Sequence, residues 1–146
     1  MTPRPLLRSL VLFVVTVAAG LTLRMAPLGL PALVVKYGGS TMWALMIYWI
    51  ASTILAGWRI PAVALISGSI ATSVEFFKLY HSPGMDAFRL TLPGMLLLGR
   101  YFSVWDIAAY WIAICAGAYV DGKMLRGGTA DNGRAKAIAR TRRSRL

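Results

Sequence analysis

The sequence predicts an all-α integral membrane protein, a bundle of four transmembrane helices with one additional short segment that is interfacial or re-entrant. Of the 146 residues, 58% are hydrophobic and only 14% are charged, against about 25% charged in an average soluble domain. Residues 37–58 form a run of 22 without a charge, and about 20 apolar residues are enough to cross a bilayer core as a helix.

The other uncharged runs are shorter and reach spanning length when their flanking residues are included. The four expected spans cover about residues 6–23, 39–58, 60–80 and 103–121. Together they form one membrane domain, residues 1–121, followed by a basic tail, residues 122–146. Arg4, Arg8 and the apolar run up to Ala19 also fit a cleaved signal peptide, but a retained first helix agrees equally well with the remaining charge pattern.

Two loops connect the spans on the side opposite the tail. In residues 24–38, two prolines and two glycines argue against a regular helix across the whole segment. In the second loop, residues 81–102, the stretch 90–99 has ten uncharged residues, which is too short to span. This stretch is the expected interfacial or re-entrant segment.

The net charge of +11 would suggest nucleic-acid binding in a soluble protein, but the expected topology gives it another explanation. Eleven of the sixteen bases lie on the side of the two termini and five on the other. Basic residues favour the cytoplasmic side, so both termini are expected in the cytoplasm. The tail, expected to be mobile, would then meet anionic membrane lipid, and no nucleic-acid partner is predicted.

The remaining charges gather on the outer side, around the second loop. Placing an ionisable group in a membrane span costs roughly 2.5–3.5 kcal/mol near the helix centre. Charged residues in or beside the spans therefore indicate a functional or structural site. The predicted polar pocket, with five bases and three acids, consists of Arg24, Lys36, Glu75, Lys78, Asp86, Arg89, Arg100 and Asp106. Its surplus of bases suits an anionic group such as a lipid phosphate. The alternative to a binding pocket is an ion-pair network that only holds the loops in place. For Asp106 a second structural alternative is a capping box with Ser103 at the start of the helix.

Small residues predict how the third and fourth spans meet. Ala64, Gly68 and Thr72 follow one another at four-residue steps and lead to Glu75; Asp106 leads to Ala109, Ala113 and Gly117, which are also spaced by four. Small residues at this spacing let membrane helices approach closely. We therefore expect the two helices to be antiparallel neighbours, with Glu75 level with Asp106.

Motifs for catalysis or metal binding are mostly absent from the sequence. There is one histidine and one cysteine, Cys115, so no paired metal motif exists and no metal or cofactor is predicted. His81, Ser82 and Asp86 could be written as a catalytic triad, but three polar residues near a proline are ordinary in a loop. No catalytic residue is assigned.

Six short motifs are spread over about residues 20–120: Arg24-x-x-Pro-Leu-Gly, Lys36-Tyr-Gly-Gly-Ser-Thr-Met-Trp, Glu75-x-x-Lys-Leu-Tyr, Asp86-x-x-Arg, Gly94-x-x-x-Leu-Gly-Arg-x-Phe and Trp105-Asp. In these motifs the chain resembles a small uncharacterised bacterial membrane family, domain-of-unknown-function family 2809, which is similar to the VanZ-like proteins. VanZ-like proteins place an acid, an arginine and an aspartate where Glu75, Arg89 and Asp106 stand, whereas Lys78 occupies a place where glutamine is usual.

The resemblance implies a multi-span protein of the bacterial cytoplasmic (inner) membrane, with relatives linked to glycopeptide resistance and no established reaction. The leading functional hypothesis is therefore non-catalytic: the outer pocket binds an amphiphilic or lipid-linked envelope molecule, or the protein assists another membrane protein. Two other classes stay open, a small intramembrane enzyme acting on a lipid headgroup and an assembly subunit of a membrane complex.

Overall fold

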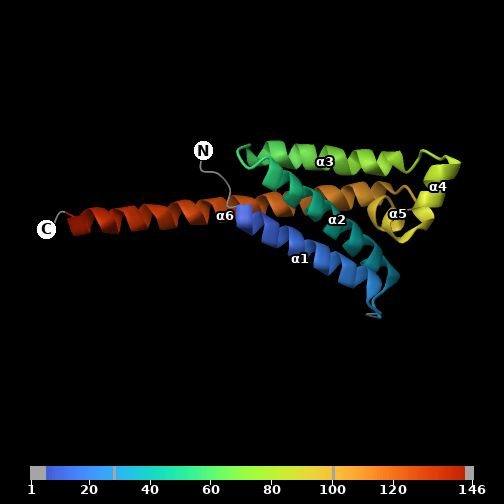
Figure 1. The fold of residues 1–146 in the computed structure, drawn as a ribbon, viewed down its shortest axis with the longest axis horizontal. Coiled ribbons are helices and arrows are strands. Elements are labelled where there is room, and N and C mark those ends of the chain that lie inside the picture. The colour runs from blue at the N-terminus through green and yellow to red at the C-terminus, as the bar shows by residue number, and fades with distance from the viewer. Residues whose placement is uncertain (1–5, 28, 100, 144–146) are drawn as a thin grey trace.

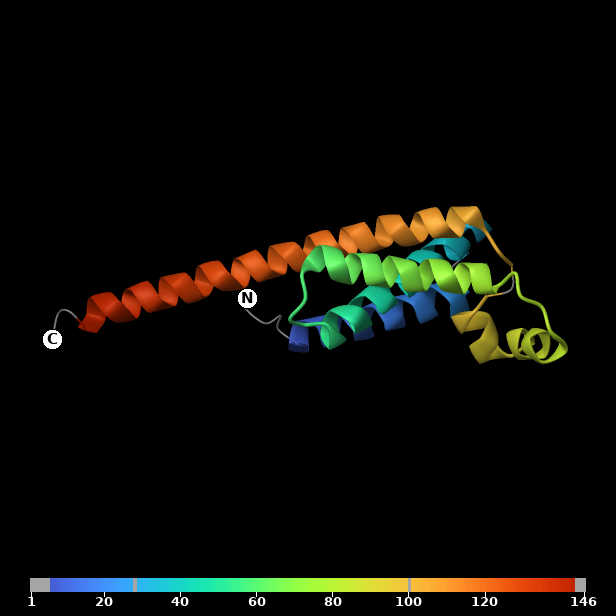
Figure 2. The ribbon, with the colours of Figure 1, turned by 90° about the horizontal axis from the view of Figure 1, so that it is seen from above.

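The computed structural model describes the backbone of residues 6–27, 29–99 and 101–143, and the side chains of these segments up to Lys123. All regular secondary structure in this part of the chain is helical. Its six helices are α1 (Leu6–Met25), α2 (Ala32–Ile54), α3 (Ile60–Phe77), α4 (Pro83–Leu90), α5 (Leu92–Leu97) and α6 (Val104–Arg143). Figures 1 and 2 show the four long helices as a bundle, with α4 and α5 together at one end.

Helix α2 is the centre of the bundle, because it packs against α1, α3 and α6, and α3 also packs against α6. The core lies around Tyr48 of α2, Val63 of α3 and Ile114 of α6, none of which is exposed. Elsewhere the long helices carry apolar side chains on their outer surface, including Leu7 and Ile112. Exposed apolar surface on this scale is expected where the neighbour is lipid.

Three of the described helical segments are long and apolar enough to cross a membrane: Leu6–Met25, Ile60–Phe77 and Val104–Lys123. Their length and composition indicate a membrane protein. Helix α2, with 23 residues, is long enough but richer in glycine, serine, threonine and aromatic residues. Its position between three helices explains this composition, since less of its surface needs to be apolar. The predicted fourth span is thus not established by hydropathy.

No regular helix runs across residues 24–38, as expected, but α2 starts earlier than the span predicted from residue 39. The helix begins at Ala32 and includes Gly38 and Gly39, so the irregular segment is confined to the residues between α1 and α2. Gly38 and Gly39 lie against Leu23 and Arg24 of α1, and a Cβ at Gly38 would overlap the Leu23 side chain. The glycines therefore permit a close helix contact rather than interrupting the helix.

The second loop contains two short helices where the sequence predicted one short segment. Helix α5 lies within the expected stretch, while α4 was not anticipated. Each begins with a hydroxyl cap: Ser82 Oγ accepts from Met85 N at 3.3 Å, and Thr91 Oγ1 accepts from Gly94 N at 3.2 Å. Such caps satisfy amide groups that have no partner inside the helix.

In the expected tail, residues 122–146, the backbone is helical as far as Arg143. Helix α6 continues without interruption to Arg143 and leaves the bundle (Figure 1); residues 144–146 lie outside the described part. Each residue added to a helix that packing has already nucleated gains one backbone hydrogen bond, whereas forming the first turn of a new helix costs conformational entropy. The packed half of α6 supplies that nucleus.

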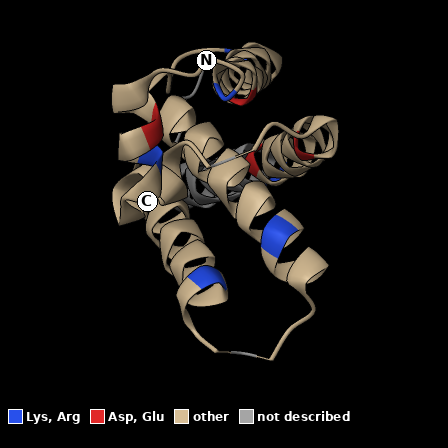
Figure 3. Ribbon diagram, turned by 90° about the vertical axis from the view of Figure 1, so that its right-hand side faces the viewer, with Lys and Arg blue, Asp and Glu red and all other residues tan. Residues whose placement is uncertain are grey.

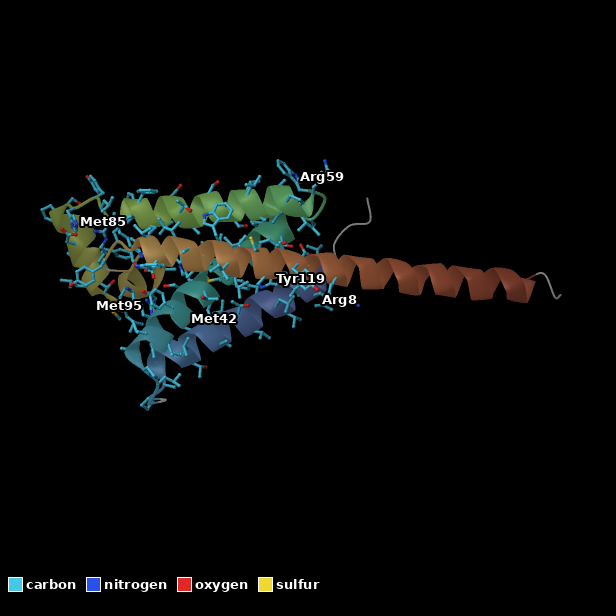
Figure 4. The ribbon with its side chains drawn as sticks, turned by 180° about the vertical axis from the view of Figure 1, so that it is seen from behind. Arg8, Met42, Arg59, Met85, Met95 and Tyr119 are labelled. Carbon is cyan, nitrogen blue, oxygen red and sulfur yellow. The ribbon has the colours of Figure 1, made fainter. Side chains whose placement is uncertain are left out.

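The bundle has two distinct ends. Met85 and Met95 mark the end covered by α4 and α5, called the cap end here, and Arg8 and Arg59 lie at the opposite, tail end, from which α6 departs (Figure 4). Figure 3 looks onto the cap end, with acidic residues in red and basic residues in blue.

Candidate ligand-binding site

Glu75 forms the centre of a polar cluster at the cap end of α3. Its side chain is completely buried. Oε1 accepts a hydrogen bond from the backbone N–H of Ser103 at 2.7 Å, and Oε2 accepts one from the Tyr110 hydroxyl at 2.7 Å. Lys78, one turn further along, places its Nζ 2.5 Å from Oε2. The carboxylate thus joins the end of α3 to the start of α6.

Lys78 connects Glu75 to the second acid of the cluster. Its Nζ lies 4.0 Å from Asp106 Oδ2, and the side chains of Lys78 and Asp106 are only 8% and 7% exposed. The two acids of α3 and α6 therefore meet at one lysine. Gly99 lies beside this amine, with a left-handed φ of 68°; a Cβ there would be 3.2 Å from Lys78 Nζ.

Asp106 does not form the capping box that was the alternative explanation for it. In a capping box the acid accepts the N–H of the cap residue, but the N–H of Ser103 is donated to Glu75 instead. Asp106 Oδ1 is buried and has no hydrogen-bond partner among the described residues. The residue lies at the edge of an open space.

That space is a cavity of about 350 Å³ at the cap end. Lys78, Asp106 and Tyr110 line one part of it. Two further cations, Arg24 of α1 and Lys36 of α2, line it as well and remain solvent-exposed. Helix α5 contributes Met95, labelled in Figure 4, and Leu96, whose carbonyl accepts a hydrogen bond from Arg24 Nη1 at 3.4 Å.

An apolar groove of about 320 Å³ adjoins the cavity between α1, α2 and α5. Its walls include Val17 and Leu21 of α1, Met42 of α2 (labelled in Figure 4) and Pro93 of α5. Cavity and groove share five lining residues: Arg24, Gly39, Trp43, Leu96 and Leu97. The two spaces are therefore adjacent, and Arg24 lies at the boundary between them. Its side chain passes over Gly39: a Cβ added to this glycine would be 3.6 Å from Arg24 Nε.

The predicted polar pocket is divided by the structure. Asp86 and Arg89 of α4 do not line the cavity. The buried Arg89 donates to the Phe77 carbonyl at 2.9 Å and to Asp86 Oδ1 at 3.2 Å, and so ties α4 to the end of α3. This pair corresponds to the alternative of a network that pins the loop. Arg100 lies outside the described residues.

The polar residues beside this pair are not arranged as a triad. His81 Nδ1 lies 3.1 Å from Asp86 Oδ1, but the Ser82 hydroxyl is the cap of α4. In the part of the chain that the structure describes, no group of three or more potential metal ligands comes together.

Three members of the site were not anticipated from the sequence: the Ser103 amide, Tyr110 and Trp43. Tyr110 follows Asp106 by four residues, so a shared helix face could have predicted it. The buried Trp43 Nε1 has no hydrogen-bond partner among the described residues, and its ring lies 5.6 Å from that of Tyr110. The Ser103 amide belongs to the backbone, which residue type alone does not reveal.

A second buried acid lies toward the tail end, where the sequence placed the start of the tail. Asp121 Oδ2 accepts hydrogen bonds from the Tyr48 hydroxyl at 2.9 Å and from Ser52 Oγ at 3.3 Å. The residue is 2% exposed. Asp121 therefore belongs to the packed bundle and fastens α6 to α2.

The predicted seam of small residues between α3 and α6 is present only in part. The helices are neighbours, but Gly68 accommodates the indole of Trp111, which a Cβ would overlap. Gly117 lies against Leu45 and Tyr48 of α2. A large ring, rather than another small residue, fills the space opposite Gly68.

Fold and site together define a small helical membrane protein with a charged cavity and an apolar groove at one end of its bundle. Residues 29–114 match the family described as "Protein of unknown function (DUF2809)", and the chain belongs to this family. No solved structure matches the chain.

Proposed function

We propose that this protein is a VanZ-like binding protein for an amphiphile that carries an anionic group, a lipid or lipid-linked envelope molecule. The anionic headgroup occupies the cavity and a hydrocarbon chain occupies the groove. The observation that carries the proposal is that the two spaces are adjacent and share five lining residues. A ligand that is charged at one end and apolar at the other fits such a pair of spaces.

The charges of the cavity favour an anion at its entrance. Lys78 is held by Glu75 and Asp106, whereas Arg24 and Lys36 have exposed side chains and no ion pair among the described residues. Arginine binds phosphate oxygens in a bidentate fashion. Arg24 is also at the junction with the groove, where the phosphate of a lipid would lie if its chain were in the groove.

The location of the site follows from the distribution of bases. Arg8 and Arg59 lie at the tail end (Figure 4), from which the basic tail extends. By the positive-inside rule this end is cytoplasmic, with both termini. The cavity then opens at the outer leaflet of the bacterial cytoplasmic membrane, where envelope precursors and lipids are accessible.

Native mass spectrometry with dioleoyl phosphatidylglycerol tests the headgroup site. Replacing both Arg24 and Lys36 by Gln is expected to weaken binding about tenfold, since a charge-assisted hydrogen bond contributes roughly 1.5–3 kcal/mol. Arg59→Gln is the matched control, because it removes a base at the tail end. Equal affinity of the double variant and the control would reject the headgroup site.

The groove is tested in the same way with a large side chain. Leu21→Trp places an indole where the hydrocarbon chain of the lipid is expected to lie and should weaken lipid binding. Leu10→Trp is the control, because Leu10 is a leucine of α1 with similar exposure that does not line the groove. If both substitutions have the same effect, the chain does not bind in the groove.

A further inference from the structure

Two residues that line the cavity each carry a buried polar atom that the protein itself does not satisfy. Asp106 Oδ1 is a hydrogen-bond acceptor and Trp43 Nε1 is a donor, and neither has a partner among the described residues. Both residues line the cavity. Because buried polar groups without partners destabilise a protein, these two atoms point to a ligand that completes their hydrogen bonds.

The open oxygen of Asp106 restricts the chemistry of that ligand. An ionised carboxylate only accepts hydrogen bonds, and Asp106 is 5% exposed. Lys78 does not donate a hydrogen bond to this oxygen, since its Nζ lies 2.5 Å from Glu75 Oε2 and 4.0 Å from the other carboxylate oxygen of Asp106, Oδ2. A phosphate oxygen would be repelled at this position. A hydroxyl or a primary ammonium group would be bound.

The positions of the lining residues give the order of the ligand's parts. Arg24 borders both groove and cavity, whereas Asp106 borders the cavity alone. A path from the groove therefore passes the cation before it reaches the acid. In a phospholipid the chain, the phosphate and the headgroup substituent follow in the same order.

From this match we infer that the ligand is a phosphodiester lipid whose headgroup carries a hydroxyl or primary ammonium donor, and that Asp106 determines this specificity by accepting a hydrogen bond from it. The inference rests on the proposed function and adds the part of the headgroup beyond the phosphate. Trp43 Nε1 is positioned to donate to the phosphate or to a headgroup oxygen.

Two pairs of lipids with identical oleoyl chains test the inference on the unmodified full-length protein. Phosphatidylglycerol and phosphatidylmethanol share an anionic phosphodiester, but only the first has headgroup hydroxyls. Phosphatidylethanolamine and phosphatidylcholine share a zwitterionic headgroup, but only the first has N–H donors. Native mass spectrometry should show a preference of about tenfold for the donor-bearing member of at least one pair, and that pair identifies the donor as a hydroxyl or an ammonium group.

Variants of Asp106 assign the preference to its carboxylate. Asp106→Leu should bind both members of the preferred pair equally, with the affinity for the lipid without a donor retained. Asp106→Asn keeps an acceptor oxygen and should retain part of the preference. Asp86→Asn is the control, because Asp86 lies outside the cavity. This variant should retain the full preference for the lipid with a donor.

The outcomes separate this inference from the proposed function. Equal binding within both pairs by the unmodified protein would overturn the inference, even if the Asp106→Leu variant cannot be purified. The dependence on Arg24 and Lys36 would then still support a headgroup site. Absence of binding of every lipid would overturn the proposed function and the inference with it.

Discussion

Glu75 is an acid whose partners come from two helices. It accepts from the Ser103 amide and the Tyr110 hydroxyl of the α6 region and pairs with Lys78 of its own helix. A carboxylate buried this completely is tolerated because each oxygen has a hydrogen-bond donor or a cation. The same arrangement keeps Lys78 close to Glu75 and leaves one oxygen of Asp106 open.

Glu75→Gln should therefore destabilise the protein by about 3 kcal/mol, because it leaves the buried ammonium of Lys78 without its closest partner. Tyr110→Phe removes only one hydrogen bond to the same carboxylate and should cost about 1 kcal/mol. Unfolding of the purified protein in detergent, followed by tryptophan fluorescence, measures both. If the Glu75→Gln protein is as stable as the unmodified one, the pair of Glu75 and Lys78 contributes nothing to the free energy of unfolding.

At the scale of elements, the turn between α4 and α5 depends on one glycine. Gly94 is buried in the first turn of α5, and a Cβ there would overlap the backbone carbonyl of Phe88. A backbone atom cannot move aside as a flexible side chain can. The close approach brings α5 back toward the bundle, where its residues Leu96 and Leu97 line both the cavity and the groove.

Gly94→Ala is thus expected to destabilise the protein by about 1–3 kcal/mol and to weaken lipid binding, since it displaces α5. The control is Gly84→Ala in α4, where a Cβ would meet nothing within 4 Å; it should be neutral or slightly stabilising, because alanine favours helix. Thermal unfolding and the lipid-binding assay compare the two variants. Similar melting temperatures would show that α5 can adjust to the extra methyl group.

At the scale of the whole molecule, the arrangement of the bundle predicts that α2 crosses the membrane together with the other three long helices. Its central position favours crossing, because α1, α3 and α6 all surround or adjoin it. A helix shielded in this way meets less lipid than its neighbours and can carry more polar residues.

Single cysteines in a Cys115→Ala background test this topology with an impermeant thiol reagent on intact cells. Leu30→Cys and Gly84→Cys should react, because both lie on loops or helices of the cap end, whereas Gly57→Cys, between α2 and α3, should be protected. The two glycine positions have open space for a side chain, and Leu30 is exposed. Identical labelling of positions 30 and 57 would show that α2 does not cross.

The sequence alone was sufficient to predict an all-helical membrane protein and to place most of its long helices. Uncharged runs of spanning length depend only on local composition, and the cost of exposing charge to lipid is the same in any fold. For the same reason Glu75, Lys78 and Asp106 could be chosen as a group of charges in or beside spans. The extent of α6 was missed because its tail lacks the apolar pattern that predicts a packed helix.

Only the tertiary structure decided which of the eight predicted residues share a space. Asp86 and Arg89 appear equivalent to Asp106 in the sequence, yet they fasten α4 to α3, while Arg24 and Lys36 line the cavity from helices much earlier in the chain. These relations depend on how the helices pack around α2, and on backbone groups such as the Ser103 amide. Distances between side chains on different helices are set by that packing, which no local pattern of residues contains.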